Sequence, residues 1–277
     1  MYKPYEFIDN YIIIAENKVK SPAWRLLLLG VLAGFFIGMG SAVTNTAAHA
    51  VENVSTAKIL GGLLFPFGLI AVIITGAELF TSNCFIIQSV LSRQVRALSM
   101  VRNLVLVYVG NFIGAALLAA ACAFGGQLSI SHGGLAVYTI KVAIAKSTLS
   151  FENAVILGIL CNILVCAGVM CSYCAKDVAG RALGAYGPIC FFVLCGFEHC
   201  IANMYYIPAG LFALSIPEYA ELAVAAGLHT SALTWNNFLF ANLLPVTLGN
   251  LIGGMGFAAL IWVTQYTQKP IQNNQTE

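Results

Sequence analysis

Two stretches of the chain place ionisable and amide side chains inside runs that are otherwise apolar enough to cross a bilayer. Both read G-x-E-x-x-x-x-N: the first carries Glu78 and Asn83, and the second carries Glu198 and Asn203. Polar backbone and ionisable side chains at membrane depth are tolerated only where they face protein or a water-filled cavity. Two interrupted helices at corresponding places in two halves of a chain indicate a permeation site. The residues therefore favour passage of a solute.

His199 distinguishes the second stretch, because its counterpart in the first stretch is Leu79. Of the four histidines, it is the one expected at mid-membrane depth. It adjoins a helix interruption, and the charge of an imidazole changes readily near physiological pH. We therefore interpret His199 as a functional residue rather than a packing residue. Thr81, in the first stretch, offers a hydroxyl that can donate to an anion or to the imidazole.

The matched acids, Glu78 and Glu198, allow two interpretations. A carboxylate beside a helix interruption can accept hydrogen bonds from backbone N–H groups that have lost their helical partners. Alternatively, the carboxylates could relay protons or bind a cation. Duplication favours support of the loops, because a relay would not need to be duplicated. Asn83 and Asn203 are then expected to start the half-helices that follow.

The remaining candidates for the walls of a pore are apolar. A hydrophobic constriction can gate by dewetting, and a bare ion pays a large desolvation cost there. A weak acid avoids that cost if it crosses as its neutral conjugate. In this hypothesis Lys146 or half-helix N-termini attract the anion, which meets a donor at His199 and passes on protonated. The expected lining residues are Phe65, Leu69, Leu79, Phe80, Val165 and Phe192.

Composition places the chain in the membrane. Its 277 residues are 60% apolar and 9% charged, with a mean hydropathy of +0.87, whereas a soluble domain carries about 25% charged residues. No basic cluster supports nucleic-acid binding. The nine cysteines contain one C-x-x-C pair, Cys171 and Cys174, without a second pair or histidine to complete a site. Packing explains them better, so we expect no metal site and no cofactor.

The apolar runs predict an all-α membrane protein with six transmembrane helices, of which the second and fifth are broken. Expected connections lie at 47–58, 126–153 and 215–236, and the last span at 238–263. Three traits recur in the same order in the two halves: LLLGVLAGFFIGMG resembles VILGILCNILVCAG, the two G-x-E-x-x-x-x-N stretches match, and GNFIG from Gly110 matches GNLIG from Gly249. Each set of three helices crosses an odd number of times, so the two repeats must point in opposite directions. We expect one domain, 1–277, with a first repeat at 22–126 and a second repeat at 136–264.

Lysine and arginine positions predict the orientation. If the N-terminus is cytoplasmic, only Lys58, Lys141 and Lys146 of the 13 basic residues fall outside. This bias follows the positive-inside rule and puts both termini in the cytoplasm, with the protein in the cytoplasmic (inner) membrane in contact with lipid. The weakly amphipathic segment 1–20 is expected to lie at the cytoplasmic interface, and 265–277 to form a cytoplasmic tail.

The motifs LFTSN and GFEHCIANMYYIPAG, with six spans and an N-terminal Tyr-Lys-Pro, resemble the formate/nitrite transporter family of formate, nitrite and hydrosulfide channels. The resemblance covers essentially the whole chain. It implies an aquaporin-like protomer fold and a homopentamer in which each protomer has its own pore. It also implies a gating role for the N-terminal helix.

The same resemblance implies roles for individual residues. His199 would be the central histidine and Thr81 would belong to the loop of the first broken helix. The other implied roles are polar residues near the histidine (Lys146, Asn162), a cytoplasmic constriction (Leu79, Phe80), an apolar pore lining (Phe65, Leu69, Phe192) and support of the second break (Glu198, Asn203).

The sequence leaves the substrate open. The continuation MYYIPAG favours formate, while nitrite and hydrosulfide remain alternatives, as does a proton-coupled anion symporter. An intramembrane enzyme would need a second catalytic group or a set of metal ligands, and no convincing one is found. We therefore expect a channel for a small monovalent anion and not an enzyme.

Overall fold

The computed structural model describes residues 1–266, and the regular elements in that range are all helices. The expected tail at 265–277 falls almost entirely outside the described residues. Six helices are long and apolar enough to cross a membrane, which confirms the predicted class. They are α2 (Ala23–Ala48), the pair α3 (Val54–Leu64) and α4 (Phe67–Thr75), α6 (Ala97–Phe124), α8 (Phe151–Cys174), α9 (Val178–Cys195), and the run of η4 (Asn237–Leu243), α12 (Leu244–Ile261) and η5 (Trp262–Tyr266).

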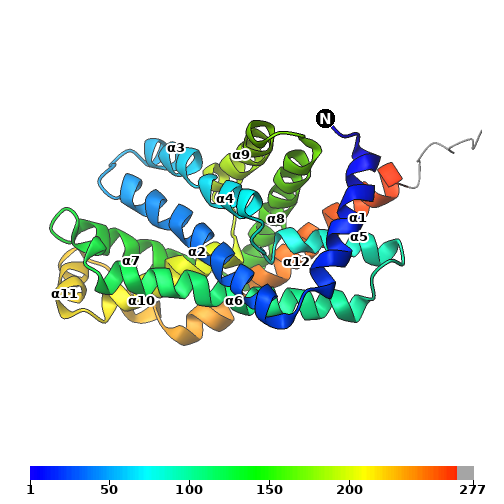
Figure 1. The fold of residues 1–277 in the computed structure, drawn as a ribbon. Helices are drawn as coiled ribbons and strands as arrows, with labels where there is room; N and C mark the ends of the chain where they lie inside the picture. The colour runs from blue at the N-terminus through cyan, green and yellow to red at the C-terminus, as the bar shows by residue number, and fades with distance from the viewer. Residues whose placement is uncertain (267–277) are drawn as a thin grey trace, which may run out of the picture.

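Shorter helices lie around and between these six (Figure 1). They are α1 (Pro4–Lys20), η1 (Ser82–Phe85), α5 (Ile86–Leu91), η2 (Gln127–Ser129), α7 (Gly134–Ser147), α10 (Cys200–Leu214), α11 (Pro217–Ala225) and η3 (Thr230–Ala232). Of these, α10 is almost entirely buried among the long helices.

Glycines let two helix pairs approach closely, α2 with α6 and α8 with α12. A Cβ atom added to Gly114 of α6 would overlap the carbonyl of Val31 in α2. One added to Gly253 of α12 would likewise overlap the carbonyl of Ile159 in α8. Small residues at such crossings allow backbone contact, which is how helices associate in a lipid environment. Because Gly114 and Gly253 occupy the same place in GNFIG and GNLIG, the repeated motif corresponds to a repeated contact.

Helical conformation stops at both G-x-E-x-x-x-x-N motifs. α4 ends at Gly76, which has φ +69°, and α9 ends at Gly196, which has φ +70°. The next residue in each case, Ala77 or Phe197, donates its N–H to a carbonyl five residues earlier at 3.0 Å. This is the Schellman arrangement, in which glycine takes the left-handed conformation without steric cost. Non-helical backbone then runs to η1 in the first case and to α10 in the second.

Several boundaries differ from those expected. Residues 47–58 are not one loop, because α2 extends to Ala48 and the Asn53 side chain caps α3 by accepting the N–H of Thr56. The connection 126–153 contains α7, as the sequence hinted, and 215–236 contains α11, with Pro217 in its first turn. The last span runs beyond 238–263 because π-helical turns extend it at both ends.

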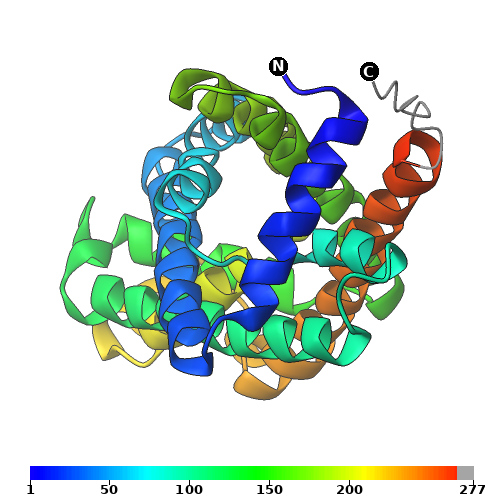
Figure 2. The same cartoon turned by 45° about the vertical axis from the view of Figure 1, so that its right-hand side comes forward.

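The N-terminal helix α1 packs against protein. Phe7, Ile8 and Tyr11 are no more than 1% exposed, and the helix contacts α5, α6, α8 and η5. Figure 2 shows α1 crossing the molecule close to the C-terminal helix. The apolar face recognised in the sequence therefore covers other helices of the chain.

Candidate functional site

The two non-helical segments meet at Thr81 and His199. The Thr81 Oγ1 atom lies 3.0 Å from the His199 Nε2 atom, and 118 residues separate them in sequence. Their exposed fractions are 0% and 3%. The structure therefore brings together the two residues that the sequence singled out for hydrogen-bond chemistry.

Hydrogen bonding selects one neutral tautomer of His199. The Nδ1 atom accepts the backbone N–H of Ala202 at 3.1 Å, because His199 is the N-cap of α10. A neutral imidazole that accepts at Nδ1 carries its proton on Nε2. Nε2–H then donates to the Thr81 oxygen, which leaves the hydroxyl hydrogen of Thr81 available to another acceptor. The sequence allowed the Thr81 hydroxyl to donate either to the imidazole or to an anion. Because the imidazole is itself the donor, the anion is the partner that remains.

Two buried asparagines hold the loops. Asn111 Oδ1 accepts the N–H of Phe80 at 2.9 Å, and Asn250 Oδ1 accepts the N–H of Cys200 at 2.9 Å. The Nδ2 atom of Asn111 donates to the carbonyls of Gly30 and Glu78, and that of Asn250 to those of Gly158 and Glu198. The carboxylates of Glu78 and Glu198 were expected to accept hydrogen bonds from the loop N–H groups. This was wrong, because the side-chain oxygens of Asn111 and Asn250 accept those N–H groups instead. Both asparagines belong to the repeated sequence, GNFIG or GNLIG, and this repetition could have identified them from the sequence.

The Glu198 carboxylate binds side chains instead. One oxygen accepts from Lys146 Nζ at 2.8 Å and the other from Asn203 Nδ2 at 2.6 Å. Asn203 lies in the first turn of α10, whose N-cap is His199, so it does not start that helix as expected. It also donates to Asn242 Oδ1 at 2.7 Å. Lys146 is thus ion-paired and does not offer a free positive charge, contrary to the expectation for it.

The Glu78 carboxylate has a corresponding set of partners. It accepts from Lys18 Nζ at 2.9 Å and from Asn83 Nδ2 at 2.6 Å, and Asn83 donates on to Asn103 Oδ1 at 2.8 Å. Sequence reasoning treated Lys18 only as a cytoplasmic charge. Burial of Lys18 acts to lower the pKa of its ammonium, but the charge and hydrogen bond of the adjacent Glu78 carboxylate, together with Tyr173, outweigh this and raise the pKa above its ordinary value.

Aromatic rings adjoin the histidine on one side. Phe192 stacks on the His199 ring with centroids 5.9 Å apart, and Phe65 meets Phe192 edge-on at 5.5 Å. On the other loop the Phe80 ring packs against Tyr108 at 4.8 Å. The other expected lining residues, Leu69, Leu79 and Val165, are each 1% exposed and belong to the same apolar core.

Asn162 lies behind the Thr81 loop. Its Nδ2 atom donates to the carbonyl of Asn250 at 2.7 Å and approaches the carbonyl of Thr81 at 3.4 Å. The structure therefore brings Asn162 to the backbone of Thr81.

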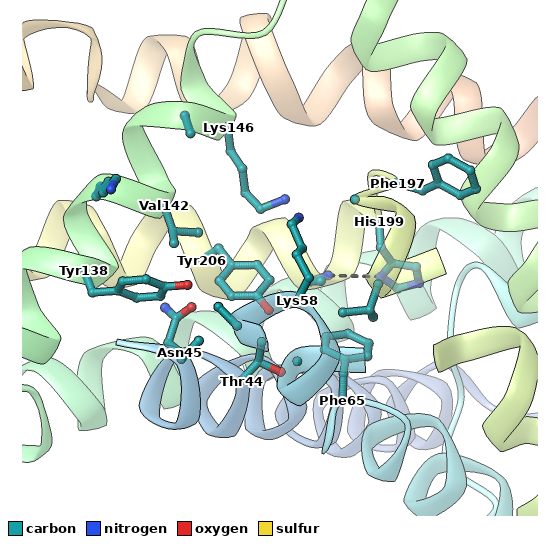
Figure 3. Close-up of a pocket in the computed structure, with 18 of the residues that line it drawn as sticks. Thr44, Asn45, Lys58, Phe65, Tyr138, Val142, Lys146, Phe197, His199 and Tyr206 are labelled. Atoms are coloured by element: carbon teal, nitrogen blue, oxygen red, sulfur yellow. Dashed lines mark hydrogen bonds between the residues drawn. The ribbon is translucent and has the colours of Figure 1, made fainter. Parts of the chain in front are cut away.

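A cavity of about 430 Å³ opens next to this site. It is lined by residues of α2, α3, α7, α9 and α10, and it reaches His199, Phe65 and Phe192 (Figure 3). The charged side chains that line it are Glu52, Lys58, Lys141, Lys146 and Glu198.

These features define a class of protein, a multi-pass α-helical membrane protein in which two non-helical segments meet around a buried histidine. The sequence profile described as "Formate/nitrite transporter" matches residues 5–264. The chain belongs to the formate/nitrite transporter family, which confirms the resemblance drawn from its motifs.

Named relatives agree with this assignment. The chain is 35% identical over 255 residues to "Formate channel FocA" of Haemophilus influenzae, covering 91% of this chain and 90% of that protein. It is 32% identical to "Formate channel BtFdhC" of Bacillus thuringiensis, with 97% of each covered. Among solved structures, a "Pentameric formate channel with formate bound" matches with a TM-score of 0.78 and 33% identity, over 89% of this chain and 98% of that one.

Proposed function

We propose that this protein is a channel for small monovalent anions of weak acids, with formate as the main substrate, across the cytoplasmic membrane. The observation that carries the proposal is the contact between Thr81 and His199, which joins the two non-helical segments inside an apolar core. Relatives named as formate channels, aligned over nine-tenths of the chain, support formate over nitrite and hydrosulfide.

The proposed path runs from the cavity past Phe65 and Phe192 to His199 and Thr81. The second constriction, formed by Leu79 and Phe80, lies beyond them, and Leu69 and Val165 contribute to the apolar lining. A bare anion among these side chains would pay a large desolvation cost. The free hydroxyl hydrogen of Thr81 offers one donor where the two non-helical segments meet, and His199 Nε2–H orients that hydroxyl. Protonation of the anion as it crosses would lower the cost further.

His199 is better suited to orienting than to donating its proton outright. Transfer of the Nε2 proton to an anion would require Nδ1 to take up a proton in exchange. Nδ1 already accepts the N–H of Ala202 at 3.1 Å, so a proton placed there would break the cap of α10. In the proposed mechanism a proton that joins the anion therefore comes from a hydronium ion of the aqueous solution that fills the cavity, which leaves a water molecule behind, and the Thr81–His199 pair stabilises the species in transit.

An inverted repeat accounts for the duplicated contacts. Glu78 and Glu198, with their lysine and asparagine partners, would hold the two loops from opposite sides of the membrane. Tyr108 and Thr247, each two residues before its GNFIG or GNLIG motif, hydrogen bond to one another at 2.8 Å, as residues beside a two-fold axis would. With both termini in the cytoplasm, the cavity opens outward. We further propose a homopentamer in which each protomer conducts through its own pore.

Flux into proteoliposomes tests the proposal. Purified protein should carry formate faster than empty vesicles do, and faster than it carries nitrite or hydrosulfide at equal concentration. A reversal potential that follows the formate gradient alone supports a channel, whereas a fixed additional dependence on the pH gradient supports a proton-coupled symporter. Formate flux no greater than that of empty vesicles would refute the proposed function.

A further inference from the structure

The cavity that reaches His199 carries one excess positive charge. Three lysines and two glutamates line it, which gives +1 with His199 neutral. Lys146 and Glu198 offset one another, because their charged atoms are 2.8 Å apart. The charge that remains free to attract an anion must therefore come from Lys58 and Lys141, less the contribution of exposed Glu52.

The Lys58 ammonium lies beside Gly196, at the end of α9. Its Nζ atom lies 3.2 Å from the point that a Cβ atom on Gly196 would occupy, and Gly196 precedes His199 by three residues. Figure 3 shows the side chains of Lys58 and Lys146 extending toward the same space beside His199. Within residues 1–266, Lys58 forms no ion pair with a carboxylate.

The environment of the Lys58 ammonium favours weak, reversible binding of a small anion. Gly196 follows the last turn of α9, where the helix dipole gives the helix end a partial negative charge that can hold a cation in place. An ammonium on a flexible stem is a compact charge with three rotatable donors. Such a group can hold a small carboxylate and release it again, and conduction requires both.

We propose that Lys58, beside the Lys146–Glu198 pair, forms an outer binding site for one monovalent anion of carboxylate type. The site precedes the Phe65–Phe192 ring pair on the path inward. This inference rests on the proposed function and adds a specificity residue to it. One excess charge matches one monovalent anion, so a dianion would leave a net negative charge in the cavity and bind less well.

Formate uptake into right-side-out membrane vesicles tests the site through Lys58→Met, Lys58→Arg and Lys141→Met. Initial rates are measured against formate concentration at low ionic strength and again at about 0.15 M salt, where charges beyond about 8 Å are screened. Lys58→Met should raise the half-saturating concentration about fivefold at low salt with little change in maximal rate, as expected for loss of one charge near 4 Å in water. Lys58→Arg should retain most of the affinity. Lys141→Met, the matched control from the same cavity wall, should change it less than twofold.

Two results would overturn the site. Lys58→Met with wild-type half-saturation would mean that the lysine does not meet the anion. Equal effects of Lys58→Met and Lys141→Met would mean a diffuse field in place of a site. Elution of each variant as the same oligomer as the wild type excludes misfolding. A wild-type protein that carries no formate would refute the proposed function itself, and that outcome is distinguishable because it appears before any substitution.

Discussion

The Thr81 hydroxyl oxygen lies within hydrogen-bond distance, 3.0 Å, of the His199 Nε2 atom, and each residue sits at the end of a non-helical segment of its own half of the chain. His199 is fixed from behind by the N–H of Ala202 at 3.1 Å. The pair is therefore the point where the two halves come together and where a polar group faces an otherwise apolar interior.

The Thr81 hydroxyl can be removed with little change in shape. Thr81→Val should lower formate flux about tenfold, because one hydrogen bond to the anion and the acceptor of His199 Nε2–H are both lost, and a net hydrogen bond is worth about 1–1.5 kcal/mol. Thr81→Ser keeps the hydroxyl and should retain most of the flux. Proteoliposome uptake of formate measures both. Equal flux in the two variants would contradict a role for the hydroxyl.

Asn111 and Asn250, the asparagines of GNFIG and GNLIG, should contribute similar amounts to the free energy of unfolding. Asn111→Leu leaves the N–H of Phe80 and the carbonyl of Glu78, both in non-helical backbone, without partners, and each buried unpaired group costs about 1–3 kcal/mol. We expect a loss of at least about 2 kcal/mol in the free energy of unfolding, and a similar loss for Asn250→Leu. Unfolding in mixed detergent, followed by circular dichroism, measures it.

Asn153→Leu is the control for these two substitutions, because Asn153 is exposed in the first turn of α8. Its effect should stay within about 0.5 kcal/mol, as is usual for a surface position. If all three variants unfold alike, the two buried amides do not hold the loops.

The buried pair of Lys18 and Glu78 should behave as a unit. Lys18→Met alone or Glu78→Gln alone should cost about 3–5 kcal/mol, because the remaining charge loses its partner inside the protein. The double variant should cost clearly less than the sum of the two. Additive losses in the same unfolding measurement would mean that the two charges do not interact.

The pH dependence of that pair follows from its lysine. The pKa of Lys18 is raised above its ordinary value near 10.5, so the stability it contributes is fully present below that pH and disappears as the pH rises through the higher folded-state pKa. The difference in unfolding free energy between wild type and Lys18→Met should therefore be level from neutral pH to about 10 and shrink only above that. A difference that shrinks well below pH 10 would contradict the assignment.

The glycine contacts between helices should not tolerate a methyl group. Gly114→Ala and Gly253→Ala place a Cβ atom against the backbone of the facing helix, where no flexible side chain can move aside. Both should reduce the yield of folded protein severely in size-exclusion chromatography. Gly256→Ala is the matched control on α12, because nothing lies within 4 Å of its added Cβ atom. A normal yield for all three variants would refute close packing at these crossings.

Much of the architecture was predictable because membrane proteins repeat simple signals. Apolar runs of bilayer length predicted the six long helices, and the family was recognisable from short motifs around Thr81 and His199. The amphipathic pattern of α1 identified its buried face but not its partner, because a pattern does not distinguish lipid headgroups from protein. Helix bounds such as Ala48 were misjudged because alanine and histidine near a span end are compatible with either helix or loop.

The contacts of the site were less accessible from sequence. Which groups satisfy the loop N–H atoms depends on the spacing of helices that are distant in sequence, so Asn111 and Asn250 were missed although their motifs were noted. Lys146 was predicted to attract the anion because its ion-pair partner, Glu198, lies 52 residues away and cannot be recognised from the sequence. Lys18 was missed for the same reason, since its carboxylate is 60 residues away. Ion pairs of this kind become visible only in three dimensions.

The most direct test is formate flux through purified protein in liposomes over a pH series, comparing wild type with His199→Ala. Loss of the imidazole removes the group that orients the Thr81 hydroxyl and caps α10, so we predict a fall in flux of about tenfold or more and a changed dependence on pH. Flux and pH dependence both equal to those of the wild type would contradict the account at its centre.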